Sequence, residues 1–328
     1  MLIALLVNAV LLAVVWALLR YINRRYYILS LAKRIKTVDG SPLKGKVVVL
    51  PGKTRFGNNF DVLKMTPAML FRFVRDAYTK ANGQSYLWYF LFAPMYNVVS
   101  AEDAEEIFQS TKLITKNVVY ELLRPFMGDG LLISTDRKWH IRRKMLTPAF
   151  HFNILQEFLD IFKEECNKFV DVLYRNVDNE VDLSKLIPQF TLNNVCETAL
   201  GVKLDDMIEG AQYREAIHAL ETVMVERACN PLMYYLPIFY LYGSYKKHTT
   251  NLKLAHDFAS RIIKRKRSQS KQQTEFKSDI GKKQRYAMLD TLLEAENEGL
   301  IDHQGICDEV NTFMCWMETL LYPRLILG

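Results

Sequence analysis

Residues 128–152 read GDGLLISTDRKWHIRRKMLTPAFHF and carry the most specific pattern of the chain. Within this segment Trp139 and Arg143 are four residues apart, which places both side chains on one face if the segment is helical. An indole N–H and a planar guanidinium in that arrangement suit a carboxylate ligand. From the spacing alone, however, the favoured interpretation is an exposed basic helix with one half-buried tryptophan. Candidate N-cap residues precede this helix, a proline turn ends it, and further basic residues surround the pair (Ser134, Thr135 and Asp136; Thr147-Pro148; Arg137, Lys138, Arg142 and Lys144).

The whole segment, and not only the Trp-Arg pair, resembles the helix C region of microsomal cytochrome P-450 enzymes of the family 4 type. In that family the W-x-x-x-R pair binds the haem propionates, so the resemblance implies that Trp139 and Arg143 are cofactor-binding residues. Three further parts are similar to the loop between helices B and C, the end of helix E and the start of helix I (residues 110–116 with 120–125; 195–201; 308–314). The resemblance therefore implies a cytochrome P-450 fold with haem as its cofactor.

Composition and charge narrow the class of protein. Half of the 328 residues are apolar, and the formal net charge is +7. The charge is concentrated in residues 20–46 and 264–285, each with a local charge of +7, so the remainder is mildly acidic. No basic face interleaved with stacking aromatic side chains is found, so no nucleic-acid partner is expected. Residues 264–267 could be taken for a nuclear signal, but the apolar N-terminal segment argues against that interpretation.

The cysteines and histidines predict no metal or nucleophile site. The five cysteines are odd in number, widely spaced and without a C-x-x-C pair, which fits a reducing compartment and small buried side chains. The six histidines show no H-E-x-x-H pattern or other metal-ligand spacing. No nucleophile elbow or phosphate loop is present in the sequence. We therefore predict no catalytic residue and no metal ligand in this chain.

The N-terminal residues predict a membrane anchor. Residues 2–19 carry no charge and are nearly long enough, as a helix, to span a hydrocarbon core. Trp16 and the cations that follow it place this end at the cytosolic interface. A cleaved signal peptide is the competing interpretation, but Leu18-Leu19-Arg20-Tyr21 offers no small residues for cleavage. We expect a transmembrane signal anchor at residues 1–19 and a basic tether at 20–50, with the body on the cytosolic side of the endoplasmic reticulum membrane.

The remaining chain predicts one mainly α domain with a small β part. Helical periodicity indicates five helices (residues 60–82, 101–109, 153–178, 186–200 and 301–314). Residues 85–92 and 95–99, joined through Ala93-Pro94, predict a β-hairpin. The apolar residues 230–242, broken by two prolines, are either a buried core segment or, by the resemblance, the loop between helices F and G that dips into the membrane. Residues 264–285 are expected to form a solvated loop.

The C-terminal residues depart from the family pattern. Residues 308–314 resemble the start of helix I, which in family 4 enzymes continues as Phe-Glu-Gly-His-Asp-Thr-Thr. Here Cys315 follows, Trp316 stands in place of the Glu and Thr319 in place of the Asp. We therefore expect the N-terminal portion of a cytochrome P-450 domain at residues 51–314. An aberrant tail follows at 315–328, where the fold is truncated or frameshifted inside helix I.

The function implied by the resemblance is haem-thiolate monooxygenase activity on fatty acids or related lipophiles. Electrons would come from an NADPH-dependent flavoprotein reductase, and membrane lipid and a lipophilic substrate would be the other partners. The cysteine that ligates the iron in the family has no counterpart in this sequence, and Cys315 lies on the wrong element to replace it. We therefore expect this incomplete fold behind its anchor to be inactive. The alternative is a non-catalytic, membrane-tethered fragment or a decoy that sequesters the reductase.

Overall fold

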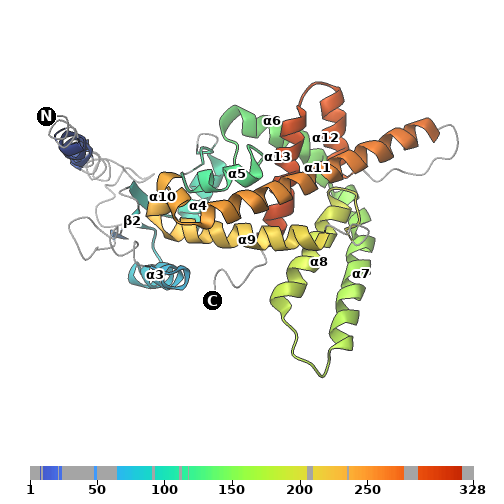
Figure 1. Cartoon of the computed structure of the whole chain (residues 1–328), viewed down its shortest axis with the longest axis horizontal. Coiled ribbons are helices and arrows are strands. Elements are labelled where there is room, and N and C mark those ends of the chain that lie inside the picture. Colours follow the sequence, from blue (N-terminus) through green and yellow to red (C-terminus); the bar gives the residue numbers. More distant parts are fainter. Residues whose placement is uncertain are drawn as a thin grey trace. The chain divides into compact units, whose positions relative to one another are not determined.

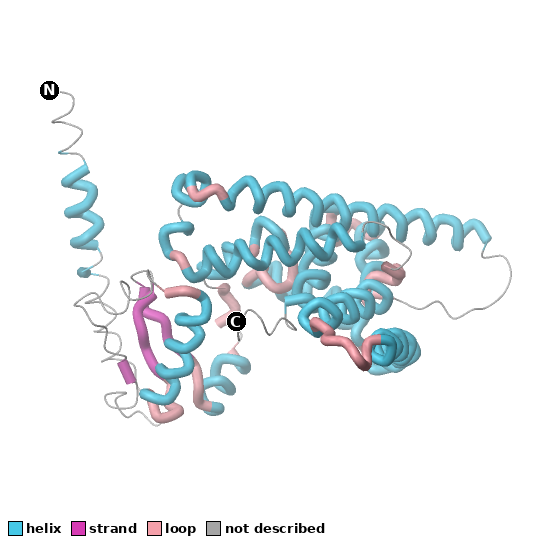
Figure 2. The backbone as a smooth tube through the Cα atoms, turned by 60° about the horizontal axis from the view of Figure 1, so that its bottom comes forward, coloured by secondary structure: helices cyan, strands magenta, loops and turns pink. Residues whose placement is uncertain are grey.

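The computed structural model describes residues 8, 10–20, 22–23, 48–49, 65–90, 93–110, 113–116, 118–204, 210–234, 236–276 and 287–319 (Figure 1). Two compact units make up the chain, Met1–Ser110 and Thr111–Gly328. Strands lie in the first unit, whereas the described residues of the second unit form helices and short connections (Figure 2). The prediction of a mainly α fold with a small β part is confirmed.

The first unit contains a three-stranded sheet in the order β1-β2-β3. β1 (Val48–Val49) pairs in parallel with β2 (Tyr86–Phe90), and β2 pairs antiparallel with β3 (Ala93–Asn97). The predicted hairpin is confirmed, but the placement of Ala93-Pro94 in its turn is wrong. Both residues belong to β3, where Pro94 lies opposite Tyr89. Proline is tolerated there because β3 ends the described sheet and its missing N–H removes no inner ladder bond.

Within residues 65–110, two helices accompany the sheet. α3 (Pro67–Lys80) begins after Thr66, whose hydroxyl accepts a hydrogen bond from the Met69 N–H at 3.3 Å. α4 (Ala101–Gln109) begins after Ser100, whose hydroxyl accepts from the Asp103 N–H at 3.1 Å. Because these caps satisfy backbone donors that the first turn leaves open, the helix starts are set locally. α4 has the predicted bounds, whereas the start of the predicted helix at 60–64 lies outside the described residues.

The predicted anchor and tether fall mostly outside the described residues. Residues 10–20 are helical, and the guanidinium carbon of Arg20 lies 5.0 Å from the centre of the Trp16 ring. Among the residues that the structure describes, no helix is long and apolar enough to cross a membrane. The anchor at residues 1–19 and the tether at 20–50 stay predictions.

The second unit consists of α-helices joined by short 3-10 turns. In chain order these are η1 (Val118–Leu122), α5 (Arg124–Met127), α6 (Asp136–Leu146), η2 (Thr147–Phe150), α7 (Phe152–Arg175), α8 (Leu183–Thr198), α9 (Gly210–Cys229), η3 (Pro231–Tyr234), α10 (Leu236–Leu241), α11 (Ser244–Phe276), α12 (Met288–Asn297) and α13 (His303–Thr319). The predicted helices at 153–178, 186–200 and 301–314 correspond to α7, α8 and α13. α8 ends at Thr198, two residues before the predicted end at 200, and Gly201 follows with the expected positive φ of +67°.

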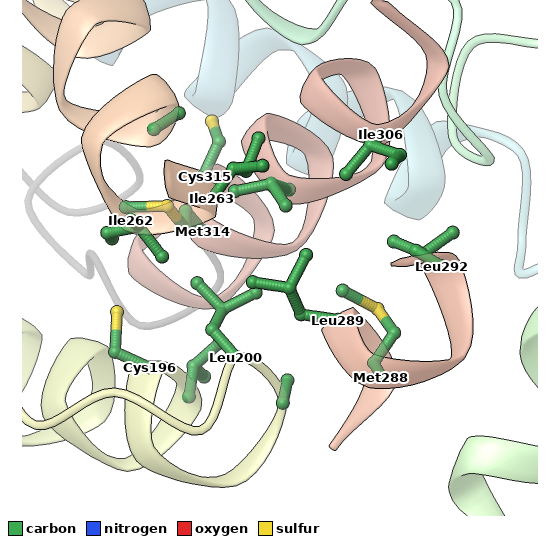
Figure 3. Close-up of a cluster of buried hydrophobic side chains, with 14 of the residues drawn as sticks. Cys196, Leu200, Ile262, Ile263, Met288, Leu289, Leu292, Ile306, Met314 and Cys315 are labelled. Carbon is green, nitrogen blue, oxygen red and sulfur yellow. The ribbon is translucent and has the colours of Figure 1, made fainter. Parts of the chain in front are cut away.

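α13 lies in the middle of the hydrophobic core of this unit. Ile306, Val310 and Met314 recur every fourth residue along it and are completely buried. Figure 3 shows Ile306 and Met314 beside side chains of α11 and α12, including Ile262 and Leu289. Burial of each such side chain contributes about 1.5–3 kcal/mol, so this row fixes which face of α13 points inward. Cys196 and Cys315 lie in the same core and Cys229 is also buried, as the prediction of small buried cysteines requires. For Cys166, which is exposed on α7, that prediction is wrong.

The basic residues from 264 onward are not the solvated loop that the sequence predicts. α11 continues to Phe276, because lysine, arginine and glutamine favour helix and no proline or glycine interrupts them. Lys266 Nζ lies 3.0 Å from the Asp290 carboxylate, and Arg267 Nη2 lies 2.7 Å from that of Glu296. Part of the basic segment therefore joins α11 to α12. Residues 277–286 lie outside the described residues.

The apolar segment 230–242 is partly buried, as the first interpretation predicts, and its insertion into a membrane stays a prediction. It forms η3 and α10 rather than an irregular loop. Phe239 is buried at 1% exposure and Met233 at 3%, so the segment has its own small core. Tyr240 and Leu241, in contrast, are 65% and 82% exposed. One face of α10 is therefore packed and the other is open.

Candidate cofactor-binding site

α6 is the helix that the Trp139/Arg143 pattern predicts. Thr135 is its N-cap residue, and the Trp139 N–H donates to the Thr135 carbonyl at 3.2 Å. The Thr135 hydroxyl donates to the Asp136 carboxylate at 3.1 Å instead of capping the backbone. Asp136 itself has φ +51°, a left-handed conformation that aspartate tolerates better than most residues. Its carboxylate then lies in the first turn, where the helix dipole favours negative charge.

Trp139 and Arg143 form a donor row on one side of α6. Trp139 is half-buried and its ring contacts His140, with 5.2 Å between ring centres. Arg143 is exposed. Among the described residues, neither the indole N–H nor the Arg143 guanidinium has a hydrogen-bond or ion-pair partner. Four residues of helix rise separate the two donors by about 6 Å along the axis, so both could meet one anionic ligand.

Arg142 lies three residues after Trp139 and is buried, which corrects its assignment to the surrounding basic surface. Arg142 is 7% exposed, and with Leu146, one turn later, it forms the buried side of α6. Its Nε lies 3.8 Å from Oε1 of Glu309 on α13. Its guanidinium occupies the space that a side chain at Gly305 would fill, because a Cβ there would lie 2.8 Å from Nη1. The absence of a side chain at Gly305 therefore admits the arginine.

Two adjacent acidic residues of α13, Asp308 and Glu309, hold the loop that precedes α6. Asp308 Oδ2 accepts a hydrogen bond from the Asp129 N–H at 3.1 Å, and Glu309 Oε2 accepts one from the Leu131 N–H at 3.0 Å. Gln304 donates to the other oxygen of Asp308 at 2.9 Å. Since charged acceptors bind backbone N–H groups more strongly than neutral ones, this carboxylate clasp (Asp308 and Glu309) ties residues 128–131 to α13.

The glycines of the GDG motif are required by the clasp. Gly128 has φ +60°, and a Cβ there would collide with the Asp308 side chain. At Gly130 a Cβ would lie 2.7 Å from the backbone oxygen of Asp308 and would collide with the Thr312 hydroxyl. Backbone and side chain therefore approach more closely than any larger residue allows. Two of the segments that resemble the cytochrome P-450 family, residues 128–132 and 308–314, thus pack against each other.

Asp129 joins the loop to the helices on either side of it. Its carboxylate lies 2.8 Å from Arg124 Nη1 of α5 and 2.6 Å from Lys138 Nζ of α6. Burial alone would raise the pKa of Asp129, but the hydrogen bonds from Lys138 and Arg124 outweigh burial and lower it. All three side chains are about a third or more exposed, so these pairs set geometry more than they add stability.

Glu309 is the most perturbed acid of the site. Burial raises its pKa to about 7, against the lowering effects of the Leu131 N–H and of Arg142. Desolvation is decisive because its side chain has no exposed surface and Arg142 Nε is 3.8 Å away, beyond hydrogen-bond distance.

We expect the free energy of unfolding of the chain to fall as the pH rises through the pKa of Glu309. The pKa is raised from 4.5 to about 7 in the folded state, so folding takes up a proton between these values. Between about pH 5 and about pH 8 the Glu309 contribution should decrease by about 3 kcal/mol. Urea unfolding at both pH values should show this loss in the wild type and not in Glu309→Gln, with exposed Glu180→Gln as the control. Equal pH slopes in wild type and Glu309→Gln would contradict the assignment.

A cavity of about 330 Å³ lies between η1 and α9. Its lining is apolar and includes Tyr120, Leu123, Met224 and Val225, with the buried carboxylate residue Glu221 among them. The size and lining match those of small-molecule sites, which are mostly apolar with few polar groups. η1 belongs to the segment that resembles the loop between helices B and C, which in that family covers the substrate.

The other chemistry-bearing residues form no second site. Among the described residues, no group of three or more histidine, cysteine or acidic side chains could hold a metal ion. No disulfide joins the five cysteines. None of the five cysteines lies on α6 or in the loop that precedes it.

The sequence interpretation missed Arg142, Asp308 and Glu309 as parts of the site. One signal could have found Glu309: it lies three residues after Ile306 and next to Val310, on the predicted buried face of the last helix. An acid at such a position requires a donor. No comparable signal marks Arg142, because its neighbours in sequence are also basic.

Comparison with known proteins agrees with this geometry. The family model described as Cytochrome P450 matches residues 50–315. Two similar proteins of Drosophila melanogaster are "Probable cytochrome P450 4ac1", 68% identical over 95% of this chain, and "Probable cytochrome P450 4ac3", 64% identical over 95%. "Cytochrome P450 4p1" of the same organism is 43% identical over 89% of this chain. The chain spans 62% of the length of each of the first two relatives and 58% of the third. The extent and identity of these matches show that the chain belongs to the cytochrome P450 family.

Proposed function

We propose that this chain supplies the propionate-binding part of a haem-thiolate monooxygenase that oxidises lipophiles, fatty acids among them. The observation that carries the proposal is the donor row of α6, where Trp139 and Arg143 have no partner among the described residues. When bound, haem supplies the activation of dioxygen for insertion of one oxygen atom into a substrate C–H bond. The role of this chain is to bind and orient the cofactor and to shape the substrate cavity.

The residues present fit the anionic edge of haem. The exposed guanidinium of Arg143 offers a planar fork of N–H donors, which suits a carboxylate in two-point contact. The indole of Trp139 offers a single donor and no acceptor, so it suits a carboxylate oxygen rather than a hydroxyl group. The carboxylate clasp holds the loop that leads into α6, which limits how far the start of the helix can move before the ligand binds and reduces the entropy lost on binding.

Other features support the proposed partners. The apolar cavity between η1 and α9 supports a lipophilic substrate. Exposed Arg137 and Lys144 give α6 a basic outer surface, which would attract an acidic surface of an NADPH-dependent flavoprotein reductase. The uncharged residues 2–19 support an anchor in the endoplasmic reticulum membrane with the body on its cytosolic side.

Loss of the donor row should abolish recognition of the propionates. We expect the full chain to bind haemin about tenfold or more tightly than haemin dimethyl ester, because only haemin offers carboxylates to Trp139 and Arg143. Soret titration with both porphyrins measures this discrimination. Trp139→Phe combined with Arg143→Gln should remove it, whereas Arg137→Gln, on the same helix, should change it by less than about twofold. If the double variant still preferred haemin over haemin dimethyl ester as strongly as the wild type does, the proposed function would be refuted.

By itself the 328-residue chain is proposed to be inactive, because no cysteine is suited to ligate the iron. Cys196 and Cys315 lie in the core, Cys229 and Cys307 have a pKa raised by burial, and Cys166 is exposed on α7. A thiolate is required for ligation, and burial disfavours one at Cys196, Cys229, Cys307 and Cys315. Cys166 lies on α7 and not on α6 or in the loop before it. After reduction and addition of carbon monoxide, the chain should therefore show no thiolate-type Soret band. Appearance of that band would overturn the claim of inactivity.

A further inference from the structure

α6 has few buried side chains that could fix its orientation. Of its eleven residues, Arg142 and Leu146 are buried, and Leu146 is the last residue of the helix. Leu146 and the partly buried Met145 contact the hydrophobic core, but both lie at the C-terminal end of the helix, away from Trp139. Arg142 is therefore the buried contact nearest to Trp139 and directly precedes Arg143. The position of the donor row depends on how Arg142 is held.

Arg142 is held by charge and shape on α13. The guanidinium lies against the backbone of Gly305, in space that a Cβ would occupy. Glu309 Oε1 lies 3.8 Å from Arg142 Nε, while Oε2 of the same carboxylate accepts the Leu131 N–H at 3.0 Å. One carboxylate thus contacts both α6 and the loop that leads into it. Because the side chains of Arg142 and Glu309, taken alone, are 9% and 0% exposed, solvent screens their attraction little.

We propose that Glu309 and Arg142 are positioning residues, which set the rotation of α6 and thereby the direction in which Trp139 and Arg143 present their N–H groups. This inference rests on the proposed binding of haem propionates by that row. Side chains end about 5–6 Å from a helix axis, so a rotation of about 20° would move each donor by about 2 Å. A shift of that size takes a hydrogen bond of normal length beyond its range. Neither positioning residue needs to touch the cofactor.

The test is the discrimination between haemin and haemin dimethyl ester in Glu309→Gln and Arg142→Lys, with the full chain. A general loss of stability would weaken the binding of both porphyrins equally. The ratio of their dissociation constants, haemin dimethyl ester over haemin, would then stay unchanged. Misdirection of the donor row would weaken the binding of haemin alone. We expect both variants to lower the ratio by about tenfold, toward the value for Trp139→Phe with Arg143→Gln. Arg137→Gln, which removes an exposed charge from α6, should keep the wild-type ratio.

The outcomes separate this inference from the proposed function. Suppose that the wild type binds haemin more tightly than the dimethyl ester and that Glu309→Gln and Arg142→Lys both keep the wild-type ratio of dissociation constants. That result would overturn the positioning role and keep the propionate site. A wild-type ratio of one would overturn the propionate site and this inference with it. A fall in Arg137→Gln as large as that in Glu309→Gln would show a general charge effect, which also overturns the positioning role. Far-UV circular dichroism shows whether Glu309→Gln and Arg142→Lys are folded. If only one of them folds, that variant decides the result.

Discussion

Replacement of Arg142 by methionine is expected to lower the free energy of unfolding by about 3–5 kcal/mol at about pH 8. Above the Glu309 pKa of about 7 the carboxylate is charged, and it has no exposed surface. Methionine keeps much of the volume but leaves that charge buried without its cationic neighbour. The loss should be smaller at about pH 5, where Glu309 can take up a proton. Urea unfolding followed by circular dichroism measures both values.

The companion variants show whether the cost comes from the unpaired charge. Arg142→Met combined with Glu309→Gln removes both charges and keeps an oxygen that can accept from the Leu131 N–H, and its stability should return to within about 1 kcal/mol of the wild type. Arg137→Met, on the exposed side of α6, should change stability by less than about 0.5 kcal/mol. A double variant no more stable than Arg142→Met would assign the loss to packing instead of charge.

Gly130→Ala is expected to destabilise the chain by about 3 kcal/mol, because the added methyl group has no space. It would lie 2.7 Å from the Asp308 backbone oxygen and collide with the Thr312 hydroxyl, and a backbone carbonyl inside α13 cannot turn aside. The loop would have to move away from the carboxylate clasp and lose the hydrogen bonds to Asp129 and Leu131. Thermal and urea unfolding should both register the loss.

Gly210→Ala is the matched control for the glycine substitution. Gly210 is also buried, but the nearest atoms to a Cβ there lie at 3.6 Å, an ordinary contact distance. Because Gly210 is the first residue of α9, alanine should be neutral or stabilise the helix by up to about 1 kcal/mol. If Gly130→Ala were as harmless as Gly210→Ala, the close approach of the loop to α13 would be wrong.

The sequence predicts the elements that depend on local signals. α4 has the predicted bounds because Ser100 provides a capping hydroxyl and acidic residues follow in the first turn. α6 and its donor row follow from the four-residue spacing of Trp139 and Arg143. The position of Ala93-Pro94 could not be read locally, because membership of a strand depends on its partner. Here that partner is β2.

The parts of the site that the sequence did not predict depend on distant residues. Arg142 has the same local signals as exposed Arg143, and what buries it is Gly305 and Glu309, far along the chain. Likewise, the need for glycine at Gly130 arises from the backbone of Asp308. The resemblance to a known family identified residues 128–132 and 308–314 but not the contact between them. The roles of Trp139 and Arg143 toward haem stay predictions.

The carboxylate clasp joins residues that are made at very different times. The hydrogen bond from Asp129 to Asp308 spans 179 positions of sequence. At about 5–20 residues per second, a ribosome completes α13 about 10–35 s after the loop that it must bind. During this interval the backbone donors of the loop lack their carboxylates, and α6 lacks the partner of Arg142. We therefore expect the donor row to reach its final orientation only when α13 has left the ribosome, at a moment set by the synthesis of α13 and not of α6.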